Sequence, residues 1–208
     1  MNNFIEIYDN ALSNESCDYI VGCFEKFEDK THIGRLGGKV NIKKKDSTDL
    51  DLLKIEHLIP DFIFKELKTS LKKNLNNYFD KYKLRCPIEY GSPWESFSIY
   101  PYSVLAKKYI KNKQGYHIWH ADAGQTAPNI FRQLVCMYYL NNVNEGGETE
   151  FYHQKLKVKP TRGSLVIFPT FFTHLHKGNV PISNDKYILN FWLMRGIDKR
   201  VKDGFIID

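Results

Sequence analysis

The feature that most constrains this fold is a change of pattern near residue 90. Beyond it, short apolar or alternating runs recur with Gly, Pro, Asn and Asp between them, at residues 95–102, 132–140, 163–168 and 187–194. Short strands separated by turn residues are typical of β-sandwiches, jelly rolls and barrels. We therefore expect a mainly β core over about residues 91–200.

The first 90 residues predict helices instead. Residues 4–8 alternate like a strand, and Ser13 and Asp61 each precede apolar residues at helical spacing, which makes both candidate N-caps. Residues 31–49 hold three glycines and a lysine run, so we predict a loop there. The picture is of two helices packed on the β core, an α+β arrangement that is mainly β.

The size and composition of the chain set limits on its class. With 208 residues and 42% hydrophobic content, it can bury one sizeable core, so we predict a single domain over residues 1–208. The net charge of +6 comes from 30 basic and 24 acidic residues. The lysines at 43–45 are followed at once by aspartates, so we interpret them as part of a solvated loop and not as a nucleic-acid site.

The cysteines and the apolar runs bear on location. Four cysteines without a CxxC pair make a disulfide framework unexpected, and Cys17 and Cys136 fit buried positions, which favours a reducing, cytoplasmic setting. The first residues lack the pattern of a signal peptide, and no run approaches the roughly 18 apolar residues of a membrane span. We therefore expect no membrane association. The oligomeric state has no signature in the sequence.

Two histidine clusters carry the candidate chemistry. On a strand, side chains two positions apart share a face, so His120 and Asp122 can point at one atom. An imidazole and a carboxylate are two ligands of the facial triad that binds non-haem Fe(II). Either His174 or His176, about fifty residues downstream, can supply the third ligand, and the spacing does not choose between them.

Lys186 follows this second cluster by ten residues and immediately precedes an apolar run. A lysine inside a barrel mouth is costly unless it meets an anion. The far carboxylate of 2-oxoglutarate is a natural partner for it. The alternative is an exposed lysine at the turn after Asn184 and Asp185.

Taken together, these motifs resemble those of the prolyl 4-hydroxylase group of Fe(II)- and 2-oxoglutarate-dependent dioxygenases. The match covers about residues 95–194 and includes His-x-Asp, Gly-Gly-Glu-Thr at 146–149, Gly-Ser-Leu-Val-Ile-Phe at 163–168, His176 and Lys186. The resemblance implies a double-stranded β-helix core, which is a cupin-like jelly roll. It makes His120, Asp122 and His176 the iron ligands and Lys186 the partner of the 2-oxoglutarate C5 carboxylate, and its ten-residue gap favours His176 over His174.

The same resemblance gives roles to Tyr139, Tyr109 and Trp192, and Trp119 is expected beside them because the implied reaction must exclude bulk water. Tyr139, in the run Tyr-Tyr-Leu-Asn at 138–141, is a second candidate contact for the C5 carboxylate. Tyr109, seven residues before Tyr116, is a candidate for the wall of the co-substrate pocket. We also expect Trp119 and Trp192 to line the mouth of the site.

The reaction implied uses Fe(II), 2-oxoglutarate and O2, hydroxylates a C–H bond and releases succinate and CO2; ascorbate is a further candidate cofactor. The leading substrate is a prolyl residue of a peptide or protein, with a free amino acid or another small molecule as the alternative. A nucleic acid is disfavoured, because Arg195 and Arg200 lack the spacing found in base-repairing oxygenases. A non-catalytic, cupin-like metal-binding module is the third reading. We expect residues 31–49 and 103–114 to cover the active site.

Overall fold

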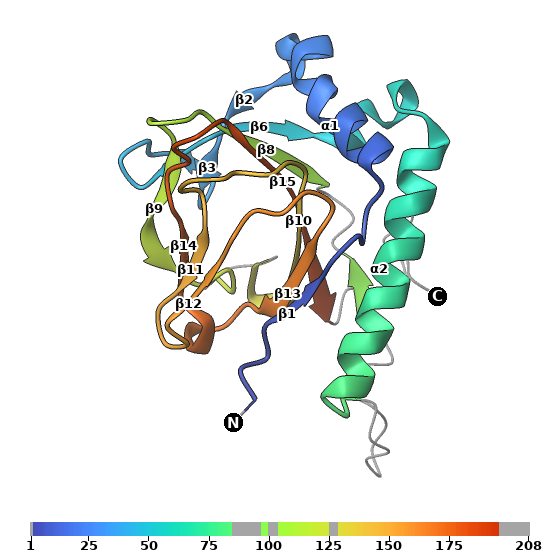
Figure 1. Ribbon diagram of the computed structural model, residues 1–208, viewed down its shortest axis with the longest axis vertical. Helices are drawn as coiled ribbons and strands as arrows, with labels where there is room; N and C mark the ends of the chain where they lie inside the picture. The colour runs from blue at the N-terminus through green and yellow to red at the C-terminus, as the bar shows by residue number, and fades with distance from the viewer. Residues whose placement is uncertain (1, 85–96, 100–103, 125–128, 196–208) are drawn as a thin grey trace.

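The computed structural model describes residues 2–84, 97–99, 104–124 and 129–195. Within these ranges, two antiparallel sheets face each other, as in a double-stranded β-helix (Figure 1). The larger sheet has the order β1 (Glu6–Tyr8), β13 (Leu165–Pro169), β10 (Arg132–Tyr139), β15 (Lys186–Arg195), β8 (Leu105–Tyr109), β6 (Thr48–Asp51) and β2 (His32–Ile33), with β7 (Phe97–Ile99) also paired to β15.

The smaller sheet has the order β12 (Leu156–Val158), β11 (Thr149–Phe151), β14 (His176–Gly178), β9 (Gly115–His120) and β5 (Lys45–Asp46). A separate hairpin joins β3 (Arg35–Leu36) to β4 (Lys39–Val40). Short 3-10 turns complete the described elements: η1 (Glu28–Lys30), η2 (Leu52–Leu58), η3 (Asn129–Phe131) and η4 (Phe172–His174).

Side-chain alternation along β15 divides the core into two layers. Ile188 and Trp192 face the space between the sheets, whereas Leu189 and Phe191 face the helices. The longest strands, β10 and β15, pair over most of their length. Both are apolar on each face, because they are covered on both sides.

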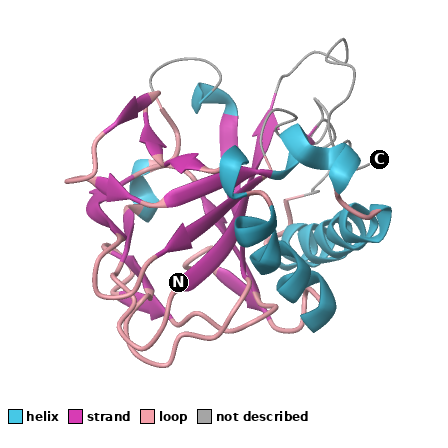
Figure 2. Cartoon of the chain, turned by 90° about the horizontal axis from the view of Figure 1, so that it is seen from above, coloured by secondary structure: helices cyan, strands magenta, loops and turns pink. Residues whose placement is uncertain are grey.

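Helices α1 (Asn14–Lys26) and α2 (Asp61–Lys81) pack on the outer face of the larger sheet (Figures 1 and 2). Ser13 is confirmed as the N-cap of α1, since its hydroxyl accepts a hydrogen bond from the Ser16 amide. The prediction for Asp61 is wrong. Pro60 occupies the cap position without a side-chain hydrogen bond, and Asp61 is the first helical residue, where a carboxylate favours the positive end of the helix dipole.

The prediction of a loop over residues 31–49 is wrong in an informative way. This segment forms short strands, of which β5 pairs with β9 of the smaller sheet and β6 pairs with β8 of the larger one. The N-terminal part is therefore not only helical, because it supplies strands to both sheets. Gly37 and Gly38 adopt positive φ angles of 57° and 79° and so make the tight turn between β3 and β4.

The expectation of a covering segment at residues 103–114 is wrong for its described part, residues 104–114. They contain β8, which lies between β15 and β6 inside the larger sheet. Of the predicted strand at 95–102, only β7 lies within the described residues. Cys17 and Cys136 are buried, as predicted.

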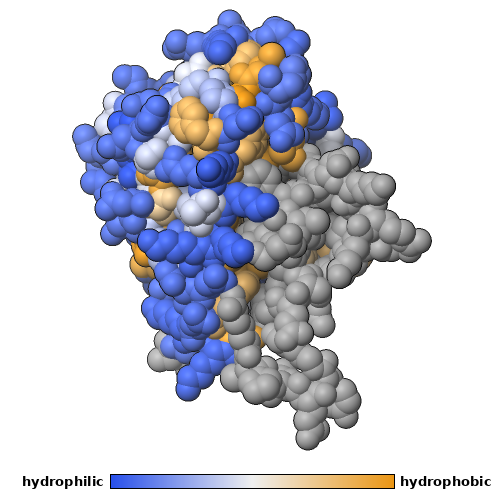
Figure 3. Space-filling view, turned by 90° about the vertical axis from the view of Figure 1, so that its right-hand side faces the viewer, coloured by the Kyte–Doolittle hydropathy of each residue, from blue (hydrophilic) through white to orange (hydrophobic). Residues whose placement is uncertain are grey.

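The side of the molecule that carries the helices is mostly hydrophilic where its residues are described, with small apolar patches (Figure 3). This fits helices that bury a single apolar stripe against the sheet. Neither helix, as far as the described residues go, combines the length and apolar character that a bilayer crossing requires.

Candidate active site

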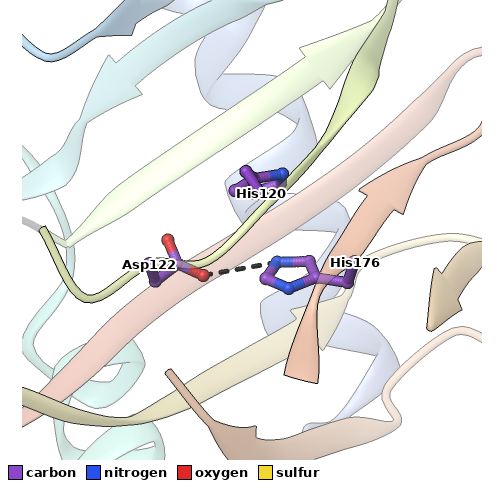
Figure 4. Close-up of side chains that lie close together, drawn as sticks. All are labelled: His120, Asp122 and His176. Atoms are coloured by element: carbon purple, nitrogen blue, oxygen red, sulfur yellow. Dashed lines mark ion pairs between the residues drawn. The ribbon is translucent and has the colours of Figure 1, made fainter. Parts of the chain in front are cut away.

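Three predicted residues come together between the two sheets. His120 ends β9, Asp122 follows it by two positions, and His176 begins β14, the neighbouring strand (Figure 4). His120 and His176 are direct register partners across these strands. One potential ligand atom from each of the three side chains lies within 4.8 Å of the others, and His176 Nε2 is 3.3 Å from Asp122 Oδ2.

Backbone hydrogen bonds orient both imidazoles. His120 Nδ1 lies 3.2 Å from the Ile118 carbonyl oxygen, and His176 Nδ1 lies 3.0 Å from that of His174. A carbonyl can only accept, so each Nδ1 carries a proton, which leaves each Nε2 as the possible metal ligand. Metal-binding histidines are commonly oriented in this way.

The protonation states also suit a cation. Burial and the neighbouring His176 lower the pKa of His120 to about 3, so its imidazole is neutral at physiological pH. Burial raises the pKa of Asp122, but the hydrogen bond and charge of His176, with His120 and Arg132, outweigh it and hold that pKa well below its usual range. Two imidazoles and one carboxylate are the donor set of the 2-His-1-carboxylate triad.

The structure also separates the two candidate third ligands. His174 lies in η4, and its Nε2 is 2.8 Å from the Asn3 carbonyl oxygen, while its Nδ1 is 2.9 Å from the Thr173 hydroxyl. Both ring nitrogens are thus engaged away from His120 and Asp122. Only His176 joins the cluster, as the ten-residue gap to Lys186 predicts.

Lys186 is buried in the same cavity. This inner pocket is lined by the three clustered residues and by Lys107, Tyr109, Thr149, Lys186 and Asn190, among others. The Lys186 ammonium donates to the Gly147 carbonyl at 2.8 Å, and within the described ranges no carboxylate lies at ion-pair distance from it. Burial lowers its pKa to about 8, against a smaller opposite effect of Glu148, so the side chain is still mostly charged at neutral pH.

The two predicted tyrosines differ in position. Tyr109 lines the inner pocket opposite Lys186 in the β8–β15 register, and the Lys186 ammonium lies 4.9 Å from its ring centroid. Tyr139 lies behind the wall, where its hydroxyl is 2.7 Å from the Thr149 hydroxyl. It therefore reaches the pocket through Thr149 rather than directly.

The site opens into a wider space. This outer cleft, of about 1140 Å³, is lined by Arg35, Lys44, Lys45, Lys107, Arg132 and Trp192, together with His120, Asp122 and others. Trp192 lies at the mouth as expected, with the Arg132 guanidinium 3.8 Å from its ring centroid. Part of residues 31–49 borders the cleft, although as short strands and not as the expected loop.

Trp119 is not at the mouth. It neighbours His120 on β9 and therefore points to the opposite face of the sheet. There its ring packs edge-on against Tyr152 at 5.1 Å and lies under the Lys177 ammonium at 4.6 Å. The expected role for Trp119 is wrong because the strand parity that directs His120 inward directs its neighbour outward.

Sequence reasoning missed Lys107. The side chain is only 5% exposed and lines both the inner pocket and the outer cleft. A usable signal was present, since Lys107 stands two positions before Tyr109 and so shares its face of β8.

The residues present fit both the metal and the co-substrate. The clustered side chains offer a facial donor set for Fe(II). Lys186 is a buried cation in the same pocket, and a buried cation requires an anionic partner. A dicarboxylate with one end at the metal and the other at Lys186 meets that requirement.

Comparisons with known proteins agree with this geometry. Residues 105–194 match the model of the 2OG-Fe(II) oxygenase superfamily. No curated protein matches the chain. Among solved structures, a viral collagen prolyl hydroxylase from Paramecium bursaria Chlorella virus-1, in complex with 2-oxoglutarate, has a TM-score of 0.66 at 20% identity, covering 93% of this chain and 97% of that one.

Two further structures have similar folds. A prolyl-4-hydroxylase from Pseudomonas putida gives a TM-score of 0.64 at 13% identity, covering 92% of each chain. A prolyl hydroxylase from Trichoplax adhaerens, in complex with a peptide fragment of the hypoxia-inducible factor, gives 0.63 at 17% identity, covering 93% of this chain and 84% of that one. The match of residues 105–194 to the 2OG-Fe(II) oxygenase superfamily, the shared fold and the clustered His-Asp-His side chains support a 2-oxoglutarate-dependent dioxygenase whose fold is like that of prolyl 4-hydroxylases.

Proposed function

We propose that this dioxygenase hydroxylates a prolyl residue of a peptide or protein and releases succinate and CO2. In this proposal His120, Asp122 and His176 bind Fe(II), and Lys186 binds the C5 carboxylate of 2-oxoglutarate. The observation that carries it is the meeting of the three side chains with buried Lys186 in one pocket that adjoins a large cleft. Solved prolyl hydroxylases of the same fold, one of them with a bound peptide, support the substrate class.

The bound metal and co-substrate supply the O2 activation that oxidises the C–H bond. The protein holds and orients them. The Ile118 and His174 carbonyls fix the two imidazoles, and Lys186 fixes the far end of the co-substrate. Met137 and Ile188 give the inner pocket apolar walls, which limit the access of bulk water to the reacting atoms.

A two-part experiment tests the proposal. First, Fe(II) and 2-oxoglutarate are titrated anaerobically into the protein while the weak visible charge-transfer band of the chelate is recorded. Second, the loaded protein is given O2 and a library of proline-containing peptides, and mass spectrometry follows peptide oxygenation and succinate formation. We expect the band, and an added oxygen on proline.

The two parts separate the possible failures. A band with no peptide oxygenated at proline would retain the oxygenase and reject the prolyl substrate, in favour of a small molecule or a nucleic acid. Metal binding without the band would reject the proposed co-substrate site and favour a metal-binding module.

A further inference from the structure

Lys107 is a buried lysine that has no role in the proposed binding of Fe(II) and 2-oxoglutarate. It lies on β8, where it pairs with Ile188 of β15 and Asp49 of β6. Across the described residues, it makes no hydrogen bond or ion pair; its ammonium lies 5.5 Å from the centroid of the Trp192 ring. Burying a charged group without an oppositely charged partner is unfavourable, so the position favours a bound anion.

Nearby charged groups do not supply that anion. Asp49 already forms an ion pair with Lys45 at 3.0 Å and accepts a hydrogen bond from the Ser47 hydroxyl at 2.6 Å. Asp122 belongs to the proposed metal site and lies 3.9 Å from Arg132. Burial, Lys45 and Arg132 lower the pKa of Lys107 to about 7, against the opposite effects of Asp49 and Asp122. The amine is therefore only partly protonated at neutral pH, and a carboxylate beside it would favour the charged form.

The position of Lys107 favours substrate over co-substrate. Lys186 pairs with Tyr109, two residues beyond Lys107 on β8, so Lys107 stands one step further towards the outer cleft. Its aromatic neighbour, Trp192, lines the outer cleft and not the inner pocket. Lys107 therefore lies where the inner pocket and the outer cleft meet, beside His120 and Asp122 and accessible to an occupant of the cleft.

The charges of the cleft point in the same direction. Its described lining includes five basic side chains and a single acidic one, which is Asp122 of the proposed metal site. The basic residues are Arg35, Lys44, Lys45, Lys107 and Arg132. Such an arrangement attracts a negatively charged occupant.

We propose that Lys107 is a specificity-determining residue that binds a carboxylate of the substrate, so that the enzyme acts on prolyl residues with an acidic residue close by in the chain. This inference rests on the proposed function for its substrate class. An acidic peptide is favoured over a nucleic acid, because the buried ammonium lies between two sheets, where a side-chain carboxylate reaches more readily than the backbone of a polynucleotide.

The test uses matched peptides and matched variants. The peptides carry one proline and either Asp or Asn at successive flanking positions, and a second set replaces proline by alanine. Binding is measured by fluorescence anisotropy on the anaerobic protein loaded with Fe(II) and 2-oxoglutarate, where turnover does not occur. The variants are Lys107→Met and Lys107→Arg. The control is Lys108→Met, on the opposite face of β8, where Lys108 contacts Asp185 at 3.4 Å.

We expect wild type and Lys108→Met to bind the best Asp peptide roughly ten- to a hundredfold more tightly than its Asn counterpart, and Lys107→Met to lose this preference. Lys107→Arg should keep much of it. The 2-oxoglutarate affinity, read from the charge-transfer band, should fall much less in Lys107→Met than the affinity for the Asp peptide does, because Lys186 is the proposed partner of the co-substrate. Methionine has similar length without the buried charge, so this variant should fold.

Three results would overturn the inference: equal binding of Asp and Asn peptides by wild type, a fall in 2-oxoglutarate affinity in Lys107→Met as large as the fall in Asp-peptide affinity, or displacement of the Asp peptide by a single-stranded oligonucleotide that binds more tightly. The proposed function fails separately. The Asp peptides could bind through Lys107 whether they contain proline or alanine, while no proline is oxygenated. In that case the carboxylate site is retained and the proposed prolyl reaction is wrong.

Discussion

The inner pocket and the outer cleft adjoin each other but are built differently. Strands β8, β11 and β15 carry Tyr109, Thr149 and Lys186 of the inner pocket, and their register with neighbouring strands fixes these side chains. The outer cleft instead takes Arg35 and Lys45 from strands of two residues. A rigid pocket suits a co-substrate that is always the same, whereas a wall of short elements can differ between relatives that act on different substrates.

Removing a proposed metal ligand should have the largest effect on the inner pocket, through loss of Fe(II) binding. We expect His176→Ala to lose Fe(II) binding by much more than the roughly 10–100-fold that loss of an outer-shell partner costs, and to lose activity with it. Anaerobic Fe(II) titration and oxygenase assays measure both.

The matched control for this prediction is His174→Ala, two residues earlier. His174 is equally buried but bonds to Asn3 and Thr173, so its loss should lower stability while the folded protein still binds Fe(II). If the two variants bound Fe(II) equally well, the assignment of His176 as the third ligand would be wrong.

Substitutions in the wall of the outer cleft should lower the free energy of unfolding more than they lower co-substrate binding in the inner pocket. Lys45 and Asp49 form a buried ion pair that holds β5 against β6, with side chains 5% and 2% exposed. We expect Asp49→Ala to lower the free energy of unfolding by about 3–5 kcal/mol, because Lys45 is left buried and unpaired. Urea denaturation measures this change.

Asp29→Ala is the control for the ion pair, since Asp29 pairs with Lys30 at the surface; we expect no measurable change. The charge-transfer band of folded Asp49→Ala sharpens the comparison. A band at the wild-type co-substrate concentration would show that the inner pocket does not depend on the cleft wall. A lost band would show that the two regions form one unit.

The same difference explains what the sequence could predict. Strands β10, β13 and β15 are apolar on both faces and visible as continuous runs, and Ser13 is a local cap. The strands of residues 31–49 are two to four residues long and exist because β8 and β9 pair with them, which no local pattern encodes. Lys107 looks like a surface charge until β8 is placed between two other strands.

Lys186→Met should weaken 2-oxoglutarate binding by roughly ten- to a hundredfold, the range of a lost charge-assisted hydrogen bond. The Fe(II) affinity should stay unchanged, because Lys186 is not among the proposed ligands. Titration of the charge-transfer band with 2-oxoglutarate measures the shift, and Lys108→Met again serves as the control. An unchanged co-substrate affinity would remove Lys186 from the inner pocket's proposed role.

The pH dependence of co-substrate binding should follow the same lysine. Burial lowers the pKa of Lys186 to about 8, and only the protonated form attracts a carboxylate. The 2-oxoglutarate affinity of the free enzyme should therefore be level below pH 8 and fall by up to about tenfold per pH unit above it. Lys186→Arg should flatten this fall, since an arginine does not titrate there. A fall of equal steepness in the arginine variant would assign the titration to another group.

The smallest expected effect concerns Tyr139, which supports the inner pocket from behind. Its hydroxyl bonds to the Thr149 hydroxyl at 2.7 Å, and Thr149 lines the pocket. Tyr139→Phe removes this neutral hydrogen bond, worth about 1 kcal/mol, together with the longer contact to the Val158 carbonyl at 3.3 Å, so we expect 2-oxoglutarate affinity to fall by roughly fivefold. Thr149→Val removes the other partner and should have a similar effect. In the double variant the losses should not add, because both single changes break the same bond. Additive losses would instead mean that Tyr139 and Thr149 each contact the co-substrate independently, and that Tyr139 reaches the C5 carboxylate directly, as the family resemblance implies.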